Sequence, residues 1–415
     1  IRNCLVGSEM CIRDSPYTGG QGIYMRLVTK AMIELGHSVE VLSGQPYPIL
    51  DKGVGLTKLP SLDLYSYDSP LEAFRLSLFK EPINLYEWLS HLSGGFSEPY
   101  TFGERMAVWA KNNYQNFDVV HDNQTLAYGL LKLKKLGLPV VGTIHHPITM
   151  DKRIDIKHAD TLSLKILKWR WYSFLKMQIK VARKLDPIIV VSENTRKDLI
   201  KDFKIETKKT RKVLHGIDHE TFHPIPTIKR KGNQIITTAS ADVPLKGLIY
   251  LIRAYAILLK EFPDLKLLVI GRLREGPTDQ ELKKEGIKEK VKFISDLTGR
   301  QIAELYAEST IAISPSVYEG FGFPAGEAMS CGIPLISTNG GSLPEVVGDA
   351  GIIVPHSNPK ALKDAIKSLL DSPEKRIEFG NKGRERVLEK FTWNRAAKEL
   401  VEVYREAIDN ADNRP

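Results

Sequence analysis

A short apolar run, a glycine-rich loop and a helix start follow one another in Ser314-Pro315-Ser316-Val317-Tyr318-Glu319-Gly320-Phe321-Gly322-Phe323-Pro324-Ala325-Gly326-Glu327-Ala328-Met329. The pattern predicts a strand that ends at Pro315 and a helix that starts near Pro324, a favoured first-turn residue. Glycines let backbone N–H groups approach a ligand, and a helix N-terminus favours an anion such as phosphate. Glu319 in the loop and Glu327 in the expected first helical turn would flank that site as acceptors for sugar or ribose hydroxyls. An ordinary strand-loop-helix crossover, with Glu327 favouring the helix dipole, is the other interpretation.

Short apolar runs alternate with longer amphipathic segments from about residue 25 to residue 370. Parallel sheets with crossover helices have this pattern, so the predicted fold class is α/β. In the first half we expect strands at 38–43, 119–121, 140–144 and 188–192. In the second half we expect strands at 235–239, 265–271, 291–294 and 311–315, and helices at 247–262 and 300–308.

The alternation lapses in residues 215–232, where Pro, Gly and a basic run form the best linker in the chain. The sequence therefore predicts two doubly wound domains, 1–224 and 225–394, and a final helix in 395–415. The opening of the chain fits less well, because Cys4-Leu5-Val6 is its only candidate strand and residues 7–15 are too polar to extend it. We interpret residues 1–15 as non-native sequence, with part of the first strand missing.

The composition narrows the class of protein. The chain has 415 residues, a net charge of +9, 26% charged and 42% hydrophobic residues, which is typical of a folded soluble protein and not of a disordered or collagenous one. Its three cysteines, Cys4, Cys11 and Cys331, form no even disulfide set and no metal-binding spacing, so a reducing, cytoplasmic location is expected. No apolar run is long enough to span a bilayer.

The stretch from Glu319 to Glu327 resembles the E-x7-E motif of retaining glycosyltransferase family 4, which has the GT-B fold: two facing Rossmann-like domains with a cleft between them. The resemblance covers nearly the whole chain except the first fifteen residues. It rests also on the segments Cys331-Gly332-Ile333-Pro334-Leu335-Ile336, Gly340-Gly341-Ser342-Leu343-Pro344-Glu345-Val346-Val347, Gly216-Ile217-Asp218 with Phe222 and Pro224, and Phe391-Thr392-Trp393. A plain strand and turn is the alternative interpretation of 331–336 and 340–347.

The resemblance implies an enzyme that moves a sugar from a nucleotide diphosphate sugar to a glycan, lipid or small-molecule acceptor, with retention of anomeric configuration. The C-terminal domain would hold the donor and the N-terminal domain the acceptor, and the last helix would cross back to the N-terminal domain. Two alternatives stay open. One is a non-catalytic sugar-nucleotide binding protein of the same fold, and the other is a GT-B nucleotide-sugar epimerase.

The resemblance also implies roles for residues of the second half. Glu319 would contact donor-sugar hydroxyls, Glu327 the nucleotide ribose, and Lys246 the donor diphosphate. The backbone of the loop would contact the sugar and phosphate through Gly320, Phe321, Gly322 and Phe323. A cation at Lys246 would offset charge on the departing diphosphate, although a solvated lysine at a helix start is the alternative.

One expected feature is missing from this half. The family usually has an arginine shortly before the lysine, but Ser240, Ala241 and Asp242 stand here. Arg272, at the end of a predicted strand, is the candidate replacement if its side chain turns into the cleft, and a surface arginine is the alternative.

Candidate residues of the first half lie where predicted strands end, at the edge where open α/β sheets bind ligands. His145 matches the family's active-site histidine. His121 is a weaker candidate for acceptor contact, and a buried or capping histidine is the interpretation we favour for it. The turn with Gly19, Gly20 and Gly22 resembles the family's glycine loop near the diphosphate and acceptor, and a plain turn before a helix is its alternative.

Residues 152–184 form a basic segment rich in aromatic side chains, which includes Lys165, Lys168, Arg170, Lys176, Trp169, Trp171 and Phe174. Such a helix can lie on an anionic membrane surface, so peripheral contact at the inner face of the membrane is one expectation. A helix with one face in the core and one basic face in solvent is the other. We expect no nucleic-acid partner, because no helix-turn-helix, zinc-finger or RNA-binding signature is found.

Metal and cofactor requirements follow from the same motifs. No Asp-x-Asp pair appears in the sequence. We therefore expect neither a metal nor a bound cofactor, and the nucleotide diphosphate sugar would be a substrate.

Overall fold

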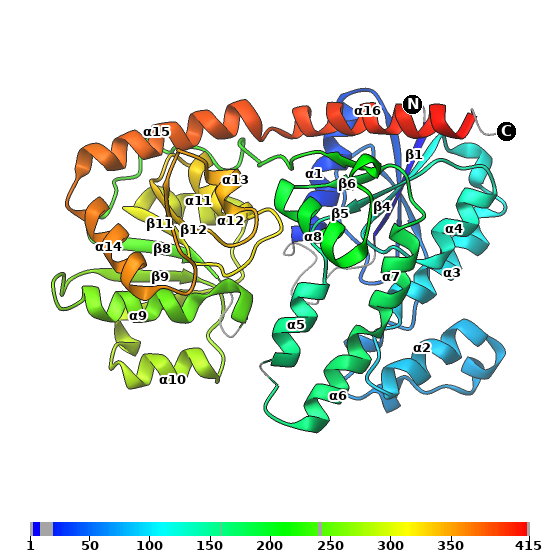
Figure 1. Ribbon diagram of the computed structural model, residues 1–415, viewed down its shortest axis with the longest axis horizontal. Helices are drawn as coiled ribbons and strands as arrows, with labels where there is room; N and C mark the ends of the chain where they lie inside the picture. The colour runs from blue at the N-terminus through cyan, green and yellow to red at the C-terminus, as the bar shows by residue number, and fades with distance from the viewer. Residues whose placement is uncertain (1–2, 9–19, 158, 240–242, 413–415) are drawn as a thin grey trace. The chain divides into compact units, whose positions relative to one another are not determined.

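The computed structural model describes residues 3–8, 20–157, 159–239 and 243–412, which divide into two compact units (Figure 1). Unit 1 consists of Ile1–Val191, Thr195–Val213 and Trp393–Pro415, and unit 2 of Ser192–Asn194 and Leu214–Thr392. The division after Val213 comes earlier than residue 224, where the sequence placed it. The reason is that the predicted linker bonds into unit 2: Ile217 N–H donates to Phe391 O at 2.7 Å, and Ser330 Oγ to Phe222 O at 2.6 Å.

Unit 1 contains a seven-stranded parallel sheet of order β3-β2-β1-β4-β5-β6-β7. Its strands are β1 (Asn3–Ser8), β2 (Ser38–Ser43), β3 (Gly55–Lys58), β4 (Val119–Asn123), β5 (Val140–Ile144), β6 (Ile188–Val190) and β7 (Thr210–Lys212). The central strands are buried along their whole length, as expected for a parallel sheet covered on both faces. The strand order reverses between β1 and β4, and ligands of such sheets bind where the carboxyl ends flank this point.

Nine α-helices lie wholly or mostly in the described part of unit 1: α1 (Gly20–Glu34), α2 (Pro82–Leu92), α3 (Glu98–Ala110), α4 (Tyr128–Lys135), α5 (Thr149–Lys157), α6 (Leu162–Trp171), α7 (Leu175–Ala182), α8 (Glu193–Phe203) and α16 (Trp393–Asp412). Short 3-10 turns η1 (Leu64–Ser66), η2 (Pro70–Ala73) and η3 (Leu76–Lys80) precede α2. The last helix, α16, packs against α1, β4 and β5, so the C-terminal helix belongs to the core of unit 1.

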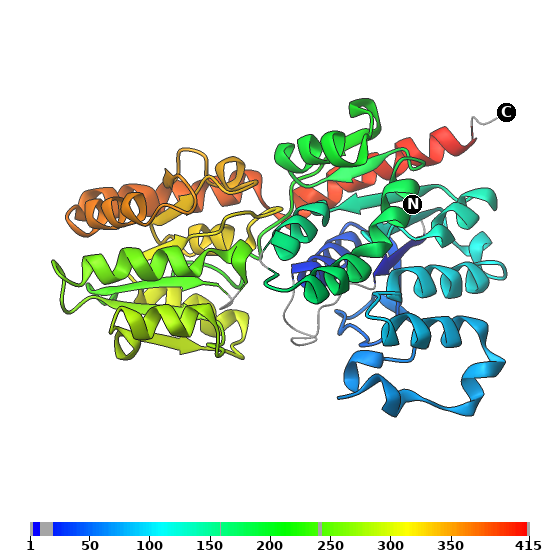
Figure 2. The same cartoon turned by 60° about the horizontal axis from the view of Figure 1, so that its bottom comes forward.

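Unit 2 contains a six-stranded parallel sheet of order β10-β9-β8-β11-β12-β13, with helices on both faces (Figure 2). Its strands are β8 (Gln234–Thr238), β9 (Lys266–Ile270), β10 (Val291–Ile294), β11 (Ile311–Ser314), β12 (Leu335–Thr338) and β13 (Ile352–Val354). Its helices are α9 (Leu248–Leu258), α10 (Pro277–Lys284), α11 (Gly299–Glu308), α12 (Phe323–Ser330), α13 (Leu343–Val347), α14 (Pro359–Leu370) and α15 (Pro373–Lys390). Here the order reverses between β8 and β11, so the loops that follow these two strands flank the expected binding edge.

The structure confirms the α/β class and the parallel sheets, and it corrects two expectations. Residues 7 and 8 do extend the first strand: β1 continues past Val6 to Gly7 and Ser8, which pair with Leu42 and Ser43 of β2. Its central place in the sheet gives the polar end of this strand backbone partners on β2, which residue polarity alone did not predict.

The second correction concerns residues 152–184, which do not form one helix. They contain most of α5, all of α6 and α7, and a 3-10 turn, η5 (Tyr172–Phe174), between the last two. Among the described helices, none is long and apolar enough to cross a membrane.

Helices α3 and α4 approach closely at two glycines, which generates a stability prediction. A Cβ atom on Gly129 would stand 1.9 Å from the carbonyl oxygen of Gly103, so the helices must separate if Gly129 becomes alanine. Such overpacking typically costs about 1–3 kcal/mol, and we expect Gly129→Ala to lower the midpoint of thermal unfolding. Gly232→Ala is the matched control, because nothing lies within 4 Å of a Cβ there. Equal midpoints for the two variants would contradict the proposed close packing.

Candidate functional site

Two loops of unit 2 meet at the binding edge of its sheet. The first follows β8 and ends in the 3-10 turn η7 (Pro244–Lys246), and the second follows β11. Val317 N–H donates to Leu245 O at 2.8 Å. Gly247 has φ +62°, and a Cβ atom there would stand 2.2 Å from Pro315 O, so only glycine permits this approach. Residues 244–247 and 315–317 therefore form one rigid platform that presents Lys246.

The platform pairs the two candidate residues that sequence placed 73 positions apart. Lys246 Nζ lies 2.7 Å from Glu319 Oε1, which also accepts a hydrogen bond from Ser316 Oγ at 2.8 Å. The backbone carbonyl of Glu319 accepts the N–H of Ser342 at 3.0 Å, and Gly341 fits against it where a side chain would not. Both charged groups keep part of their surface in solvent, so the pair is available to a ligand.

Helix α12 begins at Phe323, one residue before Pro324, with Gly322 as its N-cap at φ +100°. Its first turn contains no acidic residue, which corrects the expectation for Glu327: this side chain lies one turn further along. Burial, and secondly the nearby Asp218 carboxylate, raise the pKa of Glu327 to about 7. Hydrogen bonds from a hydroxyl group favour the charged form of a carboxyl group, so a ligand that donates to Glu327 can change its protonation state.

Two residues that sequence analysis missed support this helix start. Tyr306 of α11 is buried, and its hydroxyl bonds to Thr238 Oγ1 at 3.0 Å and to Pro324 O at 3.4 Å, which ties the end of β8 to the first turn of α12. The ring of His215 stacks on Phe323 with centroids 5.4 Å apart. Neither residue has a sequence signal of its own, because each acts only through partners far along the chain.

The loop residues differ in what they expose. Phe321 is buried against His215, Phe323 and Phe391, so its side chain serves packing and only its backbone faces the loop. Gly320 is the loop residue that follows Glu319, and Gly322 is fixed by its cap conformation.

Arg272 follows β9, one strand away from β8, and its side chain is exposed. Its guanidinium donates to both carboxylate oxygens of Asp296, at 2.9 and 2.8 Å. This geometry agrees with the alternative of a surface arginine, so its replacement of the missing arginine stays a prediction. Ser240, Ala241 and Asp242 lie outside the described residues.

In unit 1, His145 directly follows β5 at the carboxyl edge of the sheet. Its ring Nε2 lies 2.6 Å from Asn123 Oδ1, and its backbone N–H donates to Gln124 Oε1 at 2.6 Å. The Tyr24 ring contacts the His145 ring edge-on, with centroids 4.8 Å apart. The side chain is largely buried, with 8% of its surface exposed. Its orientation is thus fixed by neighbours before any ligand binds.

His121 occupies the buried position that was its alternative interpretation. It is 0% exposed, and its two ring nitrogens lie 2.5 Å from Tyr404 Oη and 2.6 Å from Thr143 Oγ1. Burial lowers its pKa to about 3, so the ring is neutral. With both nitrogens engaged inside the core, His121 has no surface to offer an acceptor, and we withdraw it from the candidate site.

The glycine turn of unit 1 is partly helical. Gly20 and Gly22 lie in the first turn of α1, which begins at Gly20, while Gly19 falls outside the described residues. Gly20 and Gly22 therefore lie in a helix and not in the predicted turn. A helix N-terminus at this edge of the sheet can bind an anion, so the position of both residues still suits a diphosphate.

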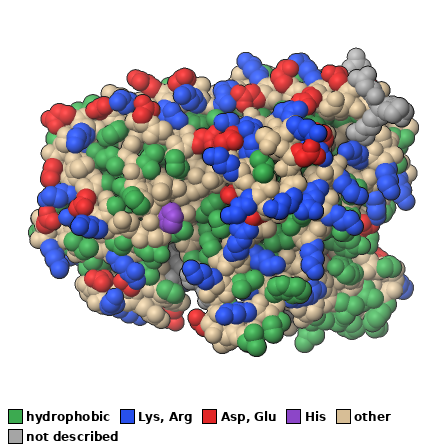
Figure 3. All heavy atoms as spheres, viewed as in Figure 1, with side chains coloured by type: hydrophobic (Ala, Val, Ile, Leu, Met, Phe, Trp, Pro, Cys, Tyr) green, Lys and Arg blue, Asp and Glu red, His purple; other side chains and the backbone are tan. Residues whose placement is uncertain are grey.

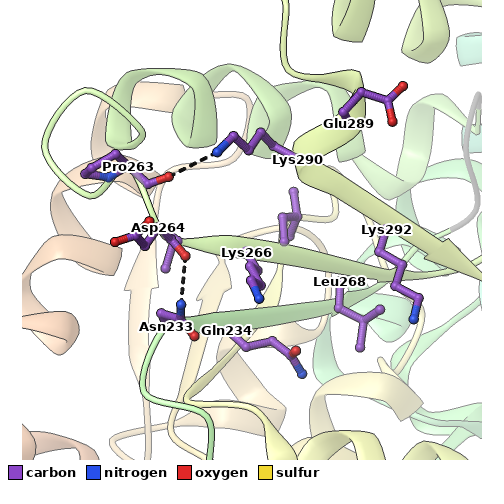
Figure 4. A pocket seen from close by; sticks show the side chains of 11 residues that line it. Asn233, Gln234, Pro263, Asp264, Lys266, Leu268, Glu289, Lys290 and Lys292 are labelled. Atoms are coloured by element: carbon purple, nitrogen blue, oxygen red, sulfur yellow. Dashed lines mark hydrogen bonds between the residues drawn. The ribbon is translucent and has the colours of Figure 1, made fainter.

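A separate hollow lies at the amino ends of β8, β9 and β10, opposite to the platform (Figure 4). Asn233, Asp264, Lys266, Lys290 and Lys292 line it, and Asn233 Nδ2 donates to Asp264 O at 2.8 Å. Lysines at an edge strand protect it from pairing with other chains, and ligands of parallel sheets bind at the other end. We therefore assign this hollow no part in the candidate site. Among the described residues, no cluster of His, Cys, Asp and Glu could hold a metal ion.

Comparisons with known proteins agree with this geometry. Residues 219–386 match the family described as glycosyl transferases group 1, and residues 18–221 match glycosyltransferase family 4. The chain is 41% identical over 404 residues to an MMP alpha-(1->4)-mannosyltransferase of Mycolicibacterium hassiacum, covering 95% of this chain and 97% of that protein.

Solved structures give the same fold. The sucrose-phosphate synthase of Thermosynechococcus elongatus superimposes with a TM-score of 0.75 at 20% identity, over 99% of this chain and all of that one. Anabaena HepE in complex with UDP and glucose gives 0.70 at 16% identity, over 98% and 100%. The chain therefore belongs to glycosyltransferase family 4, and it is a glycosyltransferase with the GT-B fold.

Proposed function

We propose that this glycosyltransferase takes its sugar from a nucleotide diphosphate sugar and transfers it with retention of anomeric configuration. The observation that carries the proposal is the Lys246–Glu319 pair, held at 2.7 Å on the platform beside the start of α12. A cation and a helix N-terminus together suit a diphosphate, and the carboxylate suits sugar hydroxyls. Unit 2 would bind the donor and unit 1 the acceptor.

The proposed mechanism assigns a task to each group. Lys246 and the positive end of the α12 dipole stabilise the negative charge that develops on the departing diphosphate. Glu319 holds the sugar, and Glu327 accepts hydrogen bonds from the ribose. The acceptor oxygen forms its bond to the sugar on the same face from which the diphosphate leaves, and the hydroxyl proton passes to the departing phosphate oxygen. His145 orients the sugar or the acceptor. We propose that Lys246 supplies the counter-charge without a metal ion and that no cofactor takes part.

The name of one similar enzyme indicates which sugar is transferred. The relative that is 41% identical is a mannosyltransferase that forms an α-(1→4) link. We propose mannose as the transferred sugar because this relative is a mannosyltransferase. The α product in its name is also what retention gives from an α-linked donor.

We also propose that unit 1 touches an anionic membrane surface through residues 152–184, on the cytoplasmic side. Helix α6 has no buried residue, and Leu162, Ile166 and Trp169 are 74%, 60% and 54% exposed. Lys152 and Lys176 lie over the Trp169 ring at 5.8 and 5.4 Å. An amphipathic ring among cations suits the headgroup region of a bilayer.

A neighbouring segment that sequence analysis missed widens this surface. Residues 71–92 expose a second apolar set, which consists of Leu71, Phe74, Leu76, Phe79, Tyr86, Leu89 and Leu92. The two segments adjoin, because Arg170 donates to Ser90 Oγ at 3.0 Å and to Ser93 Oγ at 2.9 Å. Figure 3 shows apolar and basic side chains together where Figure 1 places α2 and α6. Large exposed apolar patches of this kind mark interaction sites.

The first prediction from the proposed function tests the donor platform. Lys246→Ala and Glu319→Ala should each lower the rate of sugar transfer about 100-fold or more. The first variant loses the cation that stabilises charge on the diphosphate in the transition state, and the second loses the carboxylate that binds the donor sugar. Initial rates with GDP-, UDP- and ADP-sugars measure this, and unfolding midpoints confirm that the variants fold. Lys367→Ala is the matched control, since Lys367 also forms an ion pair in unit 2, with Glu261.

The same assay separates the alternatives. Wild-type turnover in both platform variants would refute the assignment of the donor site. A changed nucleotide sugar in the absence of acceptor would indicate an epimerase, and binding without transfer or hydrolysis would indicate a non-catalytic binder.

The second prediction concerns pH. Ribose hydroxyls donate to the ionised carboxylate, and the pKa of Glu327 is raised to about 7 in the unliganded protein. Nucleotide affinity should therefore fall as pH drops below about 7, where Glu327 takes up a proton, and level off above it. Calorimetric dissociation constants from about pH 6 to about pH 8 measure this.

Two variants sharpen the pH test. Asp218→Asn removes the negative charge that helps raise the Glu327 pKa and should move the midpoint to lower pH, while Asn can still accept the 3.0 Å bond from Thr221 N–H. Glu327→Gln should abolish the pH dependence. An unchanged profile in Glu327→Gln would show that another group titrates.

The third prediction tests the membrane proposal. The protein should sediment with vesicles that contain phosphatidylglycerol and less with pure phosphatidylcholine, because α6 combines apolar and cationic side chains. Ile166→Ser should weaken binding to the anionic vesicles. Ile377→Ser is the matched control, as Ile377 is 66% exposed in unit 2. Equal loss in both variants, or no binding by the wild type, would contradict the proposal.

A further inference from the structure

The loop after β4 in unit 1 has a strained backbone. Gln124 and Leu126 have φ values of +64° and +48°, although neither is glycine, and both are buried. Side chains other than Gly, Asn and Asp seldom adopt this left-handed conformation. Such residues persist where the surroundings hold them, and they concentrate at functional sites.

Two buried side chains hold the loop in this shape. Asp122 accepts the N–H of Leu126 at 2.9 Å and the hydroxyl of Thr125. Gln178, on α7 and 1% exposed, donates from Nε2 to Gln124 O at 3.1 Å and to Thr125 O at 3.3 Å. The backbone of the loop is therefore fixed from both sides.

The strained conformation aims the Gln124 side chain at the residues that follow β5. Its Oε1 accepts the N–H of His145 at 2.6 Å and that of His146 at 3.4 Å, while its Nε2 donates to His146 O at 2.7 Å. Strand β5 ends at Ile144, so these two residues lie beyond the strand itself. The Gln124 side-chain amide thus brackets the backbone of His145 and His146, which means that it bonds to the backbone of both residues. Thr195 Oγ1 also donates to His145 O at 3.1 Å.

We propose that Gln124 and Gln178 are positioning residues for His145. Gln178 fixes the loop, the loop aims the Gln124 amide, and the amide sets the position of the His145 backbone, while Asn123 sets its ring. The inference rests on the proposed function in one respect only, which is that His145 contacts a substrate. Small displacements of such a group are costly, since about 1 Å can change the rate about 100-fold.

The test uses variants that remove an amide without adding strain. Gln124→Gly keeps the left-handed backbone, which glycine adopts freely, and deletes the bracket. Gln178→Met keeps a similar volume and deletes the donor. Gln234→Met is the matched control, because Gln234 is also buried and bonds through Nε2, to Ser309 Oγ at 3.0 Å, in unit 2.

Two readouts are needed for each variant. Hydrogen exchange of the full-length protein reports protection of the His145 and His146 amides, and steady-state kinetics report kcat and both KM values. We expect Gln124→Gly to lose protection at these amides and to lower kcat about tenfold or more, with the donor KM unchanged. Gln178→Met should show the same pattern more weakly, and Gln234→Met should show neither change.

Each outcome either supports or overturns the proposed role of Gln124. Retained amide protection in Gln124→Gly would overturn the proposed bracket. Lost protection with a wild-type kcat would overturn its part in transfer, and His145→Ala then identifies the cause: if that variant also transfers normally, the proposed role of His145 has failed, and if it is inactive, only the positioning claim has failed. A parallel rise in the donor KM would show that the substitution also impairs donor binding and would overturn the inference.

Discussion

The candidate donor site depends on one close approach of two backbones. Residues 245–247 and 315–317 meet at the switch point of the unit 2 sheet, where Gly247 leaves no room for a side chain against Pro315 O. The Val317–Leu245 hydrogen bond fixes their relative height. This contact brings Lys246, the last residue of η7, within reach of Glu319 in the other loop. Their chemistry thus follows from a steric constraint.

Unit 1 reaches a comparable precision by the opposite means. Its loop after β4 contains no glycine, and residues 124 and 126 adopt left-handed conformations only because buried amide and carboxylate groups compensate for the strain. Glycines let backbones approach, whereas side-chain hydrogen bonds replace backbone bonds that the sheet no longer provides. The glycine contact in unit 2 tolerates changes in surrounding side chains, whereas the loop of unit 1 depends on each side chain that bonds to it.

The sequence predicted features that have a periodic or local signal. The strands at 38–43, 140–144 and 291–294 were placed correctly, because short segments rich in Val, Ile and other apolar residues between polar segments are typical of strands. Glu319 and Lys246 were recognised by motif, and their pairing is now visible. Local polarity failed for β1, where ladder partners in the centre of the sheet outweigh a polar strand end.

Other features had no signal that a single sequence can show. Tyr306, Gln124 and Gln178 act through hydrogen bonds to partners distant along the chain, and an isolated Tyr or Gln has no spacing that reveals such a partner. The three-helix course of 152–184 was missed because basic and aromatic composition persists through the breaks. The exposed set in 71–92 was missed because its segment has only two basic residues, Arg75 and Lys80, and so lacks the strongly basic composition that drew attention to α6.

The polar strand β4 explains why the chain returns to unit 1 at its end. A fully buried His121 needs partners for both nitrogens, and β5 provides only Thr143. The other partner, Tyr404, comes from α16 at the far end of the chain. Arg211 strengthens the return, because its guanidinium pairs with Glu406 of the same helix. Leaving His121 half-paired in the core would cost the desolvation of a polar group, so unit 1 is complete only when α16 has docked. The same strand then leads directly into the strained loop that holds His145, and the C-terminal helix thereby supports the candidate site through β4.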